Sequence, residues 1–198
     1  MQRTFDLDFC YKGSRTYVHG TDIFTKIMEH YTTNVKKLDL TFHGITTNNM
    51  TFLTEKPEGQ EIKVTFKCLH SNETIRLFGV ENSTKVDCRY EYFEEKIVKN
   101  STVAISSESI VLNAPTEYAF IEHIVAMNKA LVENLYSDVA GKWYFTRLQL
   151  TDNVTMQGIS SLQLVLRSNF QFKLTKSAIL VDDKEVGFVY FSLIPKES

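Results

Sequence analysis

The sequence predicts an α+β protein in which two antiparallel sheets are each wrapped around one central helix. Two segments about a hundred residues apart have the apolar spacing of an amphipathic helix. Each follows a strand-like segment and precedes a run of further strand-like segments. The chain has 198 residues and is 43% hydrophobic, which is enough for a sizeable core. We therefore expect a duplicated domain, with a first repeat at 1–100 and a second at 101–198.

The first repeat begins with residues 4–11, where apolar and polar side chains alternate as in a half-buried strand. Gly20 then turns the chain into a helix expected at 21–34. Ile23, Phe24 and Ile27 have the three- and four-residue spacing that places them on one face. Turn-forming residues, Glu81-Asn82-Ser83 among them, separate the strands that follow. These strands are expected at 37–42, 50–54, 61–69, 74–80 and 86–93.

The second repeat has the same order of elements. A strand is expected at 103–112 and a break at Asn113-Ala114-Pro115, and a helix should run from Thr116 to Tyr136, because proline suits a helix start. Val181–Tyr190 also echoes Val80–Tyr90, and we expect both segments to be hairpins. A period this long indicates a duplicated domain rather than a solenoid. The remaining strands are expected at 143–151, 161–167, 170–181 and 185–194.

Charge and hydropathy exclude two classes of partner. The net charge of −2, with Lys and Arg spread along the chain, gives no basic face for nucleic acid. No apolar run approaches the ~18 residues of a membrane span. Acidic residues interrupt the apolar N-terminal segment, which therefore lacks the core of a signal peptide. We expect a cytoplasmic protein that binds neither nucleic acid nor the membrane interior.

The cysteines and histidines give no sign of a metal centre. Cys10, Cys68 and Cys88 contain no CxxC pair and no obvious disulfide framework, so buried free thiols are expected. His30, His43 and His70 have no ligand-like spacing to a carboxylate or a cysteine. We expect neither a metal nor a cofactor.

A family resemblance rests on the order of elements and on two segments. Lys173–Leu193 resembles the last two strands of a hydroxyacyl thioester dehydratase, and Val18-His19-Gly20 lies where that group begins its helix. The chain is thus similar to the hotdog superfamily, as a double hotdog whose halves mimic a homodimer. The resemblance implies an acyl thioester of coenzyme A or of a carrier protein as substrate, in fatty acid or polyketide metabolism. The chain would be a monomer or a homodimer of double hotdogs.

The chain departs from the dehydratase pattern at two positions. Lys12 stands where that pattern has a histidine, and Thr25 where it has an acidic residue. Asn128 is similar to the asparagine that marks hotdog thioesterases. Two interpretations follow: a hydrolase or dehydratase-like enzyme, or a non-catalytic protein that binds acyl groups or other small hydrophobic ligands.

Three residues are candidates for catalysis. His19 and Asp22 flank the start of the first helix, where unpaired N–H groups and the helix dipole polarise a carbonyl, and a histidine can act as general base. The structural alternative is that Asp22 stabilises the first turn and His19 packs in it. Asn128 falls on the apolar stripe of the second helix, so its burial requires a hydrogen bond to backbone or to a ligand carbonyl.

A further group lies close in sequence to the starts of the two helices and is predicted to bind substrate. Alternatively these residues belong to the core and its rim. Glu122 shares the polar face of its helix with Lys129, so we expect it to be solvated. Because the two halves have diverged, we expect a single asymmetric site per chain, with His19 and Asp22 facing Asn128. The predicted substrate-binding residues are Arg15, Tyr17, Gly20, His123, Trp143 and Arg147.

Overall fold

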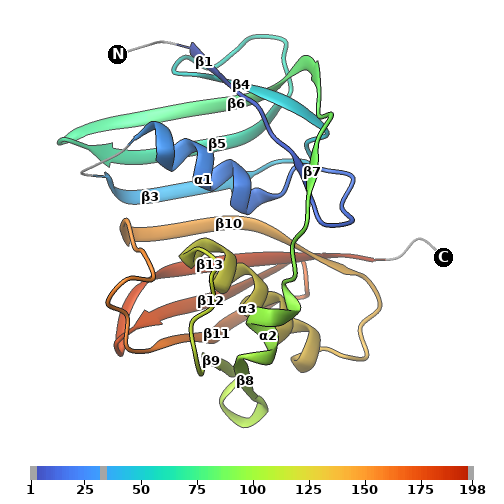
Figure 1. Ribbon diagram of the computed structural model, residues 1–198, viewed down its shortest axis with the longest axis vertical. Helices are drawn as coiled ribbons and strands as arrows, with labels where there is room; N and C mark the ends of the chain where they lie inside the picture. Colours follow the sequence, from blue (N-terminus) through green and yellow to red (C-terminus); the bar gives the residue numbers. More distant parts are fainter. Residues whose placement is uncertain (1–3, 32–34, 196–198) are drawn as a thin grey trace. The chain divides into compact units, whose positions relative to one another are not determined.

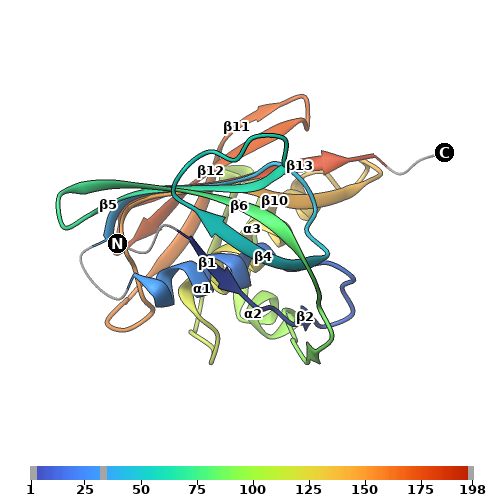
Figure 2. The ribbon, with the colours of Figure 1, turned by 90° about the horizontal axis from the view of Figure 1, so that it is seen from above.

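A computed structural model describes residues 4–31 and 35–195 of the chain. The described residues form two compact units. Unit 1 comprises Met1–Tyr92 with Thr151–Asn153, and unit 2 comprises Phe93–Leu150 with Val154–Ser198. Both units combine antiparallel strands with one long helix (Figures 1 and 2).

In unit 1 the helix α1 (Gly20–His30) lies on one face of an antiparallel sheet (Figure 2). The helix buries Ile23, Phe24 and Ile27, as its apolar spacing predicts. Its last turn contacts the sheet through His30, whose ring stacks on that of Phe5 with 4.0 Å between centroids. The strands have the order β1-β4-β6-β5-β3, with β1 (Thr4–Leu7), β3 (Val35–Phe42), β4 (Asn48–Leu53), β5 (Ile62–His70) and β6 (Glu73–Lys85).

A second, two-stranded ladder in unit 1 brings distant segments together. β2 (Tyr11–Lys12) pairs in parallel with β7 (Arg89–Tyr90). The residues just before them, Cys10 and Cys88, form a disulfide with 4.7 Å between their Cα atoms. The prediction of three free thiols is therefore wrong for this pair, and Cys68 alone is free and buried. The two cysteines are 78 residues apart in the sequence. The pairing of β2 with β7 in the folded unit brings them together, and no local sequence pattern predicts it.

In unit 2 the helix α3 (Phe120–Leu135) contacts its sheet through β8, β9, β11 and β13. The short helix α2 (Glu95–Lys99), which the sequence did not predict, contacts α3 and β8. The strands have the order β10-β13-β12-β11-β9-β8, with β8 (Ser101–Ala104), β9 (Ser109–Leu112), β10 (Lys142–Asp152), β11 (Leu162–Phe170), β12 (Leu174–Val181) and β13 (Lys184–Ile194).

The structure corrects several predicted boundaries. The strand expected at 4–11 is interrupted between β1 and β2, and the one expected at 103–112 is divided by a 3₁₀ turn (Ile105–Ser107). The helix expected at 21–34 ends at His30, and 32–34 lie outside the described residues. The helix expected from Thr116 begins at Phe120, because residues before it form a separately hydrogen-bonded loop.

The echoed hairpin is correct in unit 2 and wrong in unit 1. Val181 pairs with Lys184 around a turn in which Asp182 and Asp183 have φ of 49° and 62°. The corresponding residues of unit 1 lie within β6, which continues as a strand to Lys85. The pairing of β4 with β6 continues past these residues to Asn48 opposite Lys85, with a register shift between Asn48 and Met50. The local preference of Asn82 appears within this irregular part of the ladder, where its Oδ1 accepts from the Thr84 N–H (2.9 Å).

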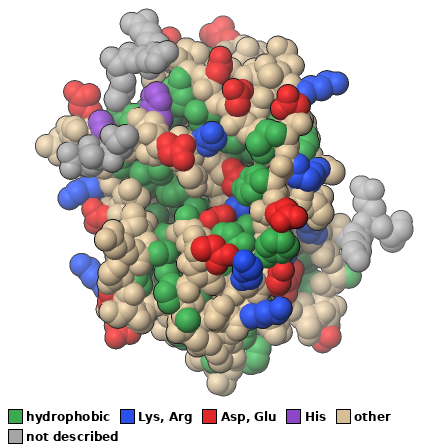
Figure 3. Space-filling view, viewed as in Figure 1, with side chains coloured by type: hydrophobic (Ala, Val, Ile, Leu, Met, Phe, Trp, Pro, Cys, Tyr) green, Lys and Arg blue, Asp and Glu red, His purple; other side chains and the backbone are tan. Residues whose placement is uncertain are grey.

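On the face shown in Figure 3, acidic and basic side chains are interspersed. Within 4–31 and 35–195, no helix has the length and apolar character needed to cross a bilayer.

Candidate functional site

The start of α1 is fixed by the two residues before it. Val18 donates its N–H to the Thr46 carbonyl (2.8 Å), which ties this segment to the β3–β4 connection. His19 is the N-cap residue, with extended φ and ψ of −77° and 139°, and its carbonyl accepts from the Asp22 N–H (3.0 Å). Gly20 is the first helical residue rather than the turn that the sequence predicted. His19 as a residue is 8% exposed and is thus buried in unit 1.

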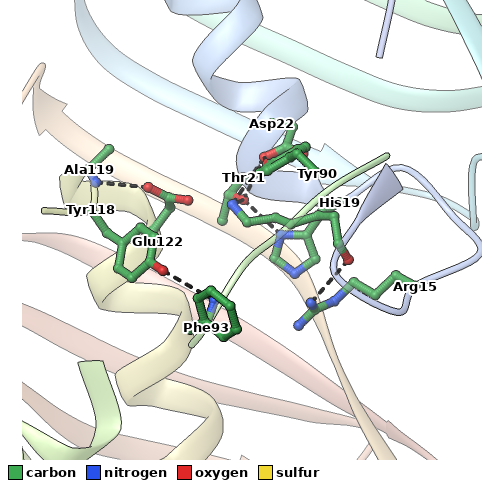
Figure 4. A network of polar contacts seen from close by, with 10 residues as sticks. Arg15, His19, Thr21, Asp22, Tyr90, Phe93, Tyr118, Ala119 and Glu122 are labelled. Carbon is green, nitrogen blue, oxygen red and sulfur yellow. Dashed lines mark hydrogen bonds and ion pairs between the residues drawn. The ribbon is translucent and has the colours of Figure 1, made fainter. Parts of the chain in front are cut away.

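Five side chains around this helix start form one polar group, here called the His19 cluster: Lys12, His19, Thr21, Asp22 and Tyr90. The Thr21 hydroxyl lies at its centre, 2.7 Å from His19 Nδ1, 3.0 Å from Lys12 Nζ and 3.2 Å from Asp22 Oδ1 (Figure 4). Lys12 Nζ also contacts Asp22 Oδ1 at 3.1 Å. The Tyr90 hydroxyl lies 2.9 and 2.8 Å from the two Asp22 oxygens. The predicted pair His19 and Asp22 is therefore linked through Thr21.

The inner part of the cluster is buried and pairs opposite charges, whereas Tyr90 at its edge is 41% exposed. Lys12 and Thr21 are each 1% exposed, and the Asp22 side chain is 16% exposed. A buried ammonium is tolerated only with a compensating partner, and the Asp22 carboxylate supplies one. The Tyr92 ring supplies another, with its centroid 4.1 Å from Lys12 Nζ.

Sequence reasoning missed three members of this cluster. Lys12 was noted only as a departure from the dehydratase pattern, yet that same position brings its Nζ to the start of α1. Thr21 could have been found as a hydroxyl residue in the first turn of the helix. Tyr90 had no signal, because 68 residues separate it from Asp22.

Asn128 lies in the interior of α3 and is completely buried. This confirms its predicted place on the apolar stripe. Neither Oδ1 nor Nδ2 has a hydrogen-bond partner among the described residues. An amide buried without partners costs about 1–3 kcal/mol, so this residue is either a weak point of unit 2 or a group awaiting a bound partner.

His123 and Glu122 organise the loop before α3. His123 is fully buried, its Nε2 accepts from the Thr116 N–H (3.2 Å), and its Nδ1 lies 3.0 Å from the Ala119 carbonyl. Burial lowers the pKa of His123 below its ordinary value, so the ring is neutral near pH 7. Glu122 Oε2 accepts from the Ala119 N–H at 2.8 Å, which caps the first turn of α3 at a solvent-exposed position (Figure 4).

Of the remaining predicted substrate-binding residues in unit 1, Arg15 lies beside the His19 cluster. Its Nη1 is 3.4 Å from the Lys12 carbonyl, and its guanidinium is 5.7 Å from the centroid of the Tyr92 ring. Tyr17 is half-buried in the segment that leads to His19. Arg15 is thus a charged side chain at the rim of the cluster.

Trp143 and Arg147 occupy different environments on β10 of unit 2. Trp143 is buried in an aromatic group with Tyr136 and Phe172, at centroid distances of 6.0 and 6.3 Å, as expected for a core residue. Arg147 is half-buried, with its guanidinium 5.5 Å from the centroid of the Tyr190 ring. Across the described part of the chain, no three or more His, Cys, Asp or Glu side chains gather in a way that could hold a metal ion.

No protein-family model and no curated protein matches this chain. Several solved structures are similar to this chain. A TesB protein from Mycobacterium avium subspecies paratuberculosis is similar with a TM-score of 0.52 at 7% identity, over 98% of this chain and 94% of that one. The dehydratase domain of PpsC from Mycobacterium tuberculosis, solved in complex with C12:1-CoA, is similar with a TM-score of 0.50 at 7% identity, over 96% and 92%.

Proposed function

We propose that this protein binds acyl thioesters of coenzyme A or of a carrier protein and hydrolyses them. The chain has a hotdog fold, as its similarity to a TesB protein and to a dehydratase domain indicates. The observation that carries the proposal is the Asn128 amide, fully buried and without a partner among the described residues. A ligand that supplied a carbonyl to Nδ2 would satisfy this amide.

The thioester carbonyl suits this amide chemically. Its oxygen accepts a hydrogen bond from Asn128 Nδ2, and the amide then polarises the carbon for attack. The other end of the side chain, Oδ1, accepts from water or from an N–H group of the thioester's carrier arm. An apolar helix face around a single amide is also the usual composition of a site for an acyl chain.

Hydrolysis is favoured over dehydration by two residues of unit 1. Lys12 occupies the position of the histidine in the dehydratase pattern, and its Nζ lies 3.1 Å from Asp22 Oδ1 in an ion pair. Thr25 stands at the position of the acidic residue. Hydrolysis of a thioester needs only a water molecule that attacks its carbonyl carbon, which then releases a free thiol.

The second candidate is a binding protein without catalysis. The same loss of the dehydratase pair at Lys12 and Thr25 favours it, because an acyl site can persist after its chemistry is lost. We also propose that the two units are hotdog repeats, at 1–100 and 101–198, so that the chain is a double hotdog. Each unit supports this with one long helix on an antiparallel sheet.

Replacement of Asn128 tests the proposal. Asn128→Leu removes the amide with little change in volume, and we expect it to weaken binding of a non-hydrolysable acyl-CoA by about 10- to 100-fold, the effect of one lost buried hydrogen bond. The same variant without ligand should be more stable by about 1–3 kcal/mol, because an unpartnered buried amide is gone. Calorimetry and thermal unfolding measure the two effects.

The matched control is Asn134→Leu on the same helix, since Asn134 is exposed and donates to the Ala130 carbonyl (2.8 Å). It should change neither property. Undiminished affinity in Asn128→Leu would refute the role of this amide. Thiol release from a panel of acyl-CoA chain lengths, beside native mass spectrometry for a retained ligand, separates the hydrolase from the binding protein.

A further inference from the structure

We propose that the Cys10–Cys88 disulfide is an exchange site for low-molecular-weight thiols, and that its opening releases the chain at 87–92 from the start of α1. This stretch carries β7 and is here called the β7 segment. All of the residues concerned belong to unit 1, and the site is independent of the proposed function.

The disulfide is accessible to a thiol from solution. Exchange begins when a thiolate attacks one sulfur of a disulfide, so its rate depends on access to that sulfur. Cys88 is an exposed residue and Cys10 is half-buried, whereas the free Cys68 is buried in β5. Unit 1 thus combines a disulfide that a small thiol can reach with a protected thiol.

The backbone pairing of the β7 segment is small. Among the described strands β7 pairs with β2 alone, over two residues, in a ladder separate from the large sheet. The Tyr11 N–H donates to the Cys88 carbonyl and the Gly13 N–H to the Tyr90 carbonyl, both at 2.9 Å. Two short strands form a marginal ladder in water. The covalent bond beside this ladder therefore does much to keep it formed.

Polar side chains add contacts that water can replace. The Tyr90 hydroxyl lies 2.9 and 2.8 Å from the two Asp22 oxygens, and Arg89 Nη1 donates to the Arg15 carbonyl at 2.8 Å. Tyr90 and Arg89 are both exposed residues. Hydrogen bonds at such positions contribute little, because water takes the place of either partner when they break.

The β7 segment also covers a buried charge. Lys12 Nζ lies 4.1 Å from the centroid of the Tyr92 ring and 5.8 Å from that of the Tyr90 ring. Lys12 is 1% exposed, and both of these rings belong to the β7 segment. Departure of the segment would therefore bring water to the Lys12 ammonium. Hydration of a buried ammonium is favourable, so it promotes the open form once the disulfide is broken.

The exchange proceeds in two steps. The thiolate of a small thiol bonds to Cys88 Sγ, the disulfide breaks, and Cys10 Sγ leaves as a thiolate that takes up the proton of the small thiol. A second small thiol then attacks the small-molecule sulfur of the mixed disulfide, which frees Cys88 as a thiol. Two small thiols are thereby oxidised to one small disulfide, and the protein disulfide gains two electrons and two protons. A small disulfide reverses both steps.

The test uses the full chain in buffers that range from oxidised to reduced glutathione. Peptide mass spectrometry gives the fraction of Cys10–Cys88 disulfide, and a short pulse of an amine-acetylating reagent gives the reactivity of Lys12. We expect the bond to open in millimolar reduced glutathione. The acetylation rate of Lys12 should rise with it by at least about 10-fold, because opening of the segment becomes easier. Lys26, an exposed lysine of α1, should react equally in every buffer.

Cys68 distinguishes release of the β7 segment from unfolding of unit 1. It is buried in β5, so it resists a thiol-alkylating reagent while the large sheet is intact. We expect it to stay unmodified in the buffers in which Lys12 becomes reactive. Alkylation of Cys68 in step with acetylation of Lys12 would mean that unit 1 unfolds as a whole, and would overturn a local release.

Two further results overturn the proposal, and both come from the wild type. A disulfide that resists millimolar reduced glutathione is no exchange site. A disulfide that opens while Lys12 stays protected does not release the β7 segment. Cys10→Ser with Cys88→Ser should make Lys12 reactive in every buffer, and slow acetylation in this variant would also contradict the release. Cys68→Ala is the matched control and should follow the wild type.

Discussion

At the start of α1 the Thr21 hydroxyl and the Asp22 carboxylate have hydrogen-bond partners on every side, whereas both ends of the Asn128 amide inside α3 have none among the described residues. Both sites are polar groups on the long helix of their unit, and both Thr21 and Asn128 are buried. The polar groups at the start of α1 therefore satisfy one another without a ligand. Asn128 is incomplete, and a bound polar group would relieve it.

The two units also differ in how they are held together. Unit 1 has a disulfide between Cys10 and Cys88, and the described residues of unit 2 contain no cysteine. The bond closes a loop of 78 residues and ties together the strands that carry Lys12 and Tyr90. A chemical reductant therefore breaks a disulfide in unit 1 and leaves the covalent structure of unit 2 unchanged.

The largest expected effect is on unit 1 when this disulfide is removed. Loop-closure entropy for such a separation corresponds to about 4.5 kcal/mol of stability. We expect Cys10→Ser with Cys88→Ser to lower the free energy of unfolding of unit 1 by about this amount. Hydrogen exchange, which resolves the two units, should show faster exchange in α1 and unchanged exchange in α3.

Two controls accompany this experiment. The wild type treated with a reductant should match the double variant, and Cys68 should resist alkylation in both, because it is buried and burial raises its pKa to about 11. Equal destabilisation of both units would contradict the contrast between them.

The second effect concerns the charge balance of the His19 cluster. Lys12→Met leaves the Asp22 carboxylate in a largely buried site without its ammonium partner. We expect a loss of about 3 kcal/mol, since breaking a buried ion pair from one side is costly. Lys12→Met with Asp22→Asn should recover part of it.

Lys26→Met is the matched control, because Lys26 is an exposed lysine on the same helix and its loss should change stability by less than about 0.5 kcal/mol. Urea unfolding measures all four proteins. A Lys12→Met variant as stable as Lys26→Met would show that the pair contributes nothing and that the cluster is not charge-balanced as described.

The contrast between the units also marks what the sequence could show. Helical spacing located α1 and α3 and placed Asn128 on a buried stripe, because local periodicity reports which face is apolar. It could not show that the amide has no partner, since that depends on every neighbouring element. The Cys10–Cys88 bond and the contact of Tyr90 with Asp22 were equally invisible, because β2 and β7 meet only in the folded unit.

Turn chemistry was reliable in one unit and misleading in the other. Asp182-Asp183 forms the predicted turn, because both residues tolerate the left-handed conformation that the β12–β13 hairpin requires. Asn82-Ser83 has a similar local preference, yet it remains in β6 because pairing with β4 continues to Lys85. Tertiary hydrogen bonds decided between the two outcomes.

The smallest expected effect is the acid sensitivity of unit 2, and it comes from His123. Burial lowers the pKa of this ring in the folded state, so the unfolded chain binds the proton more readily. The contribution of neutral His123 to the free energy of unfolding should therefore be fully present above the unfolded pKa of about 6.5. It should fall as the pH drops below that value, by at most about 1.4 kcal/mol per pH unit.

His123→Gln should flatten the pH dependence of the unfolding free energy between about pH 5 and 6.5. His43→Gln should not, because His43 is exposed. Protonation of His123 breaks its bond from the Thr116 N–H, which frees the loop before α3. If His123→Gln retains the wild-type slope, another group accounts for the proton uptake, and this buried histidine does not govern the acid stability of unit 2.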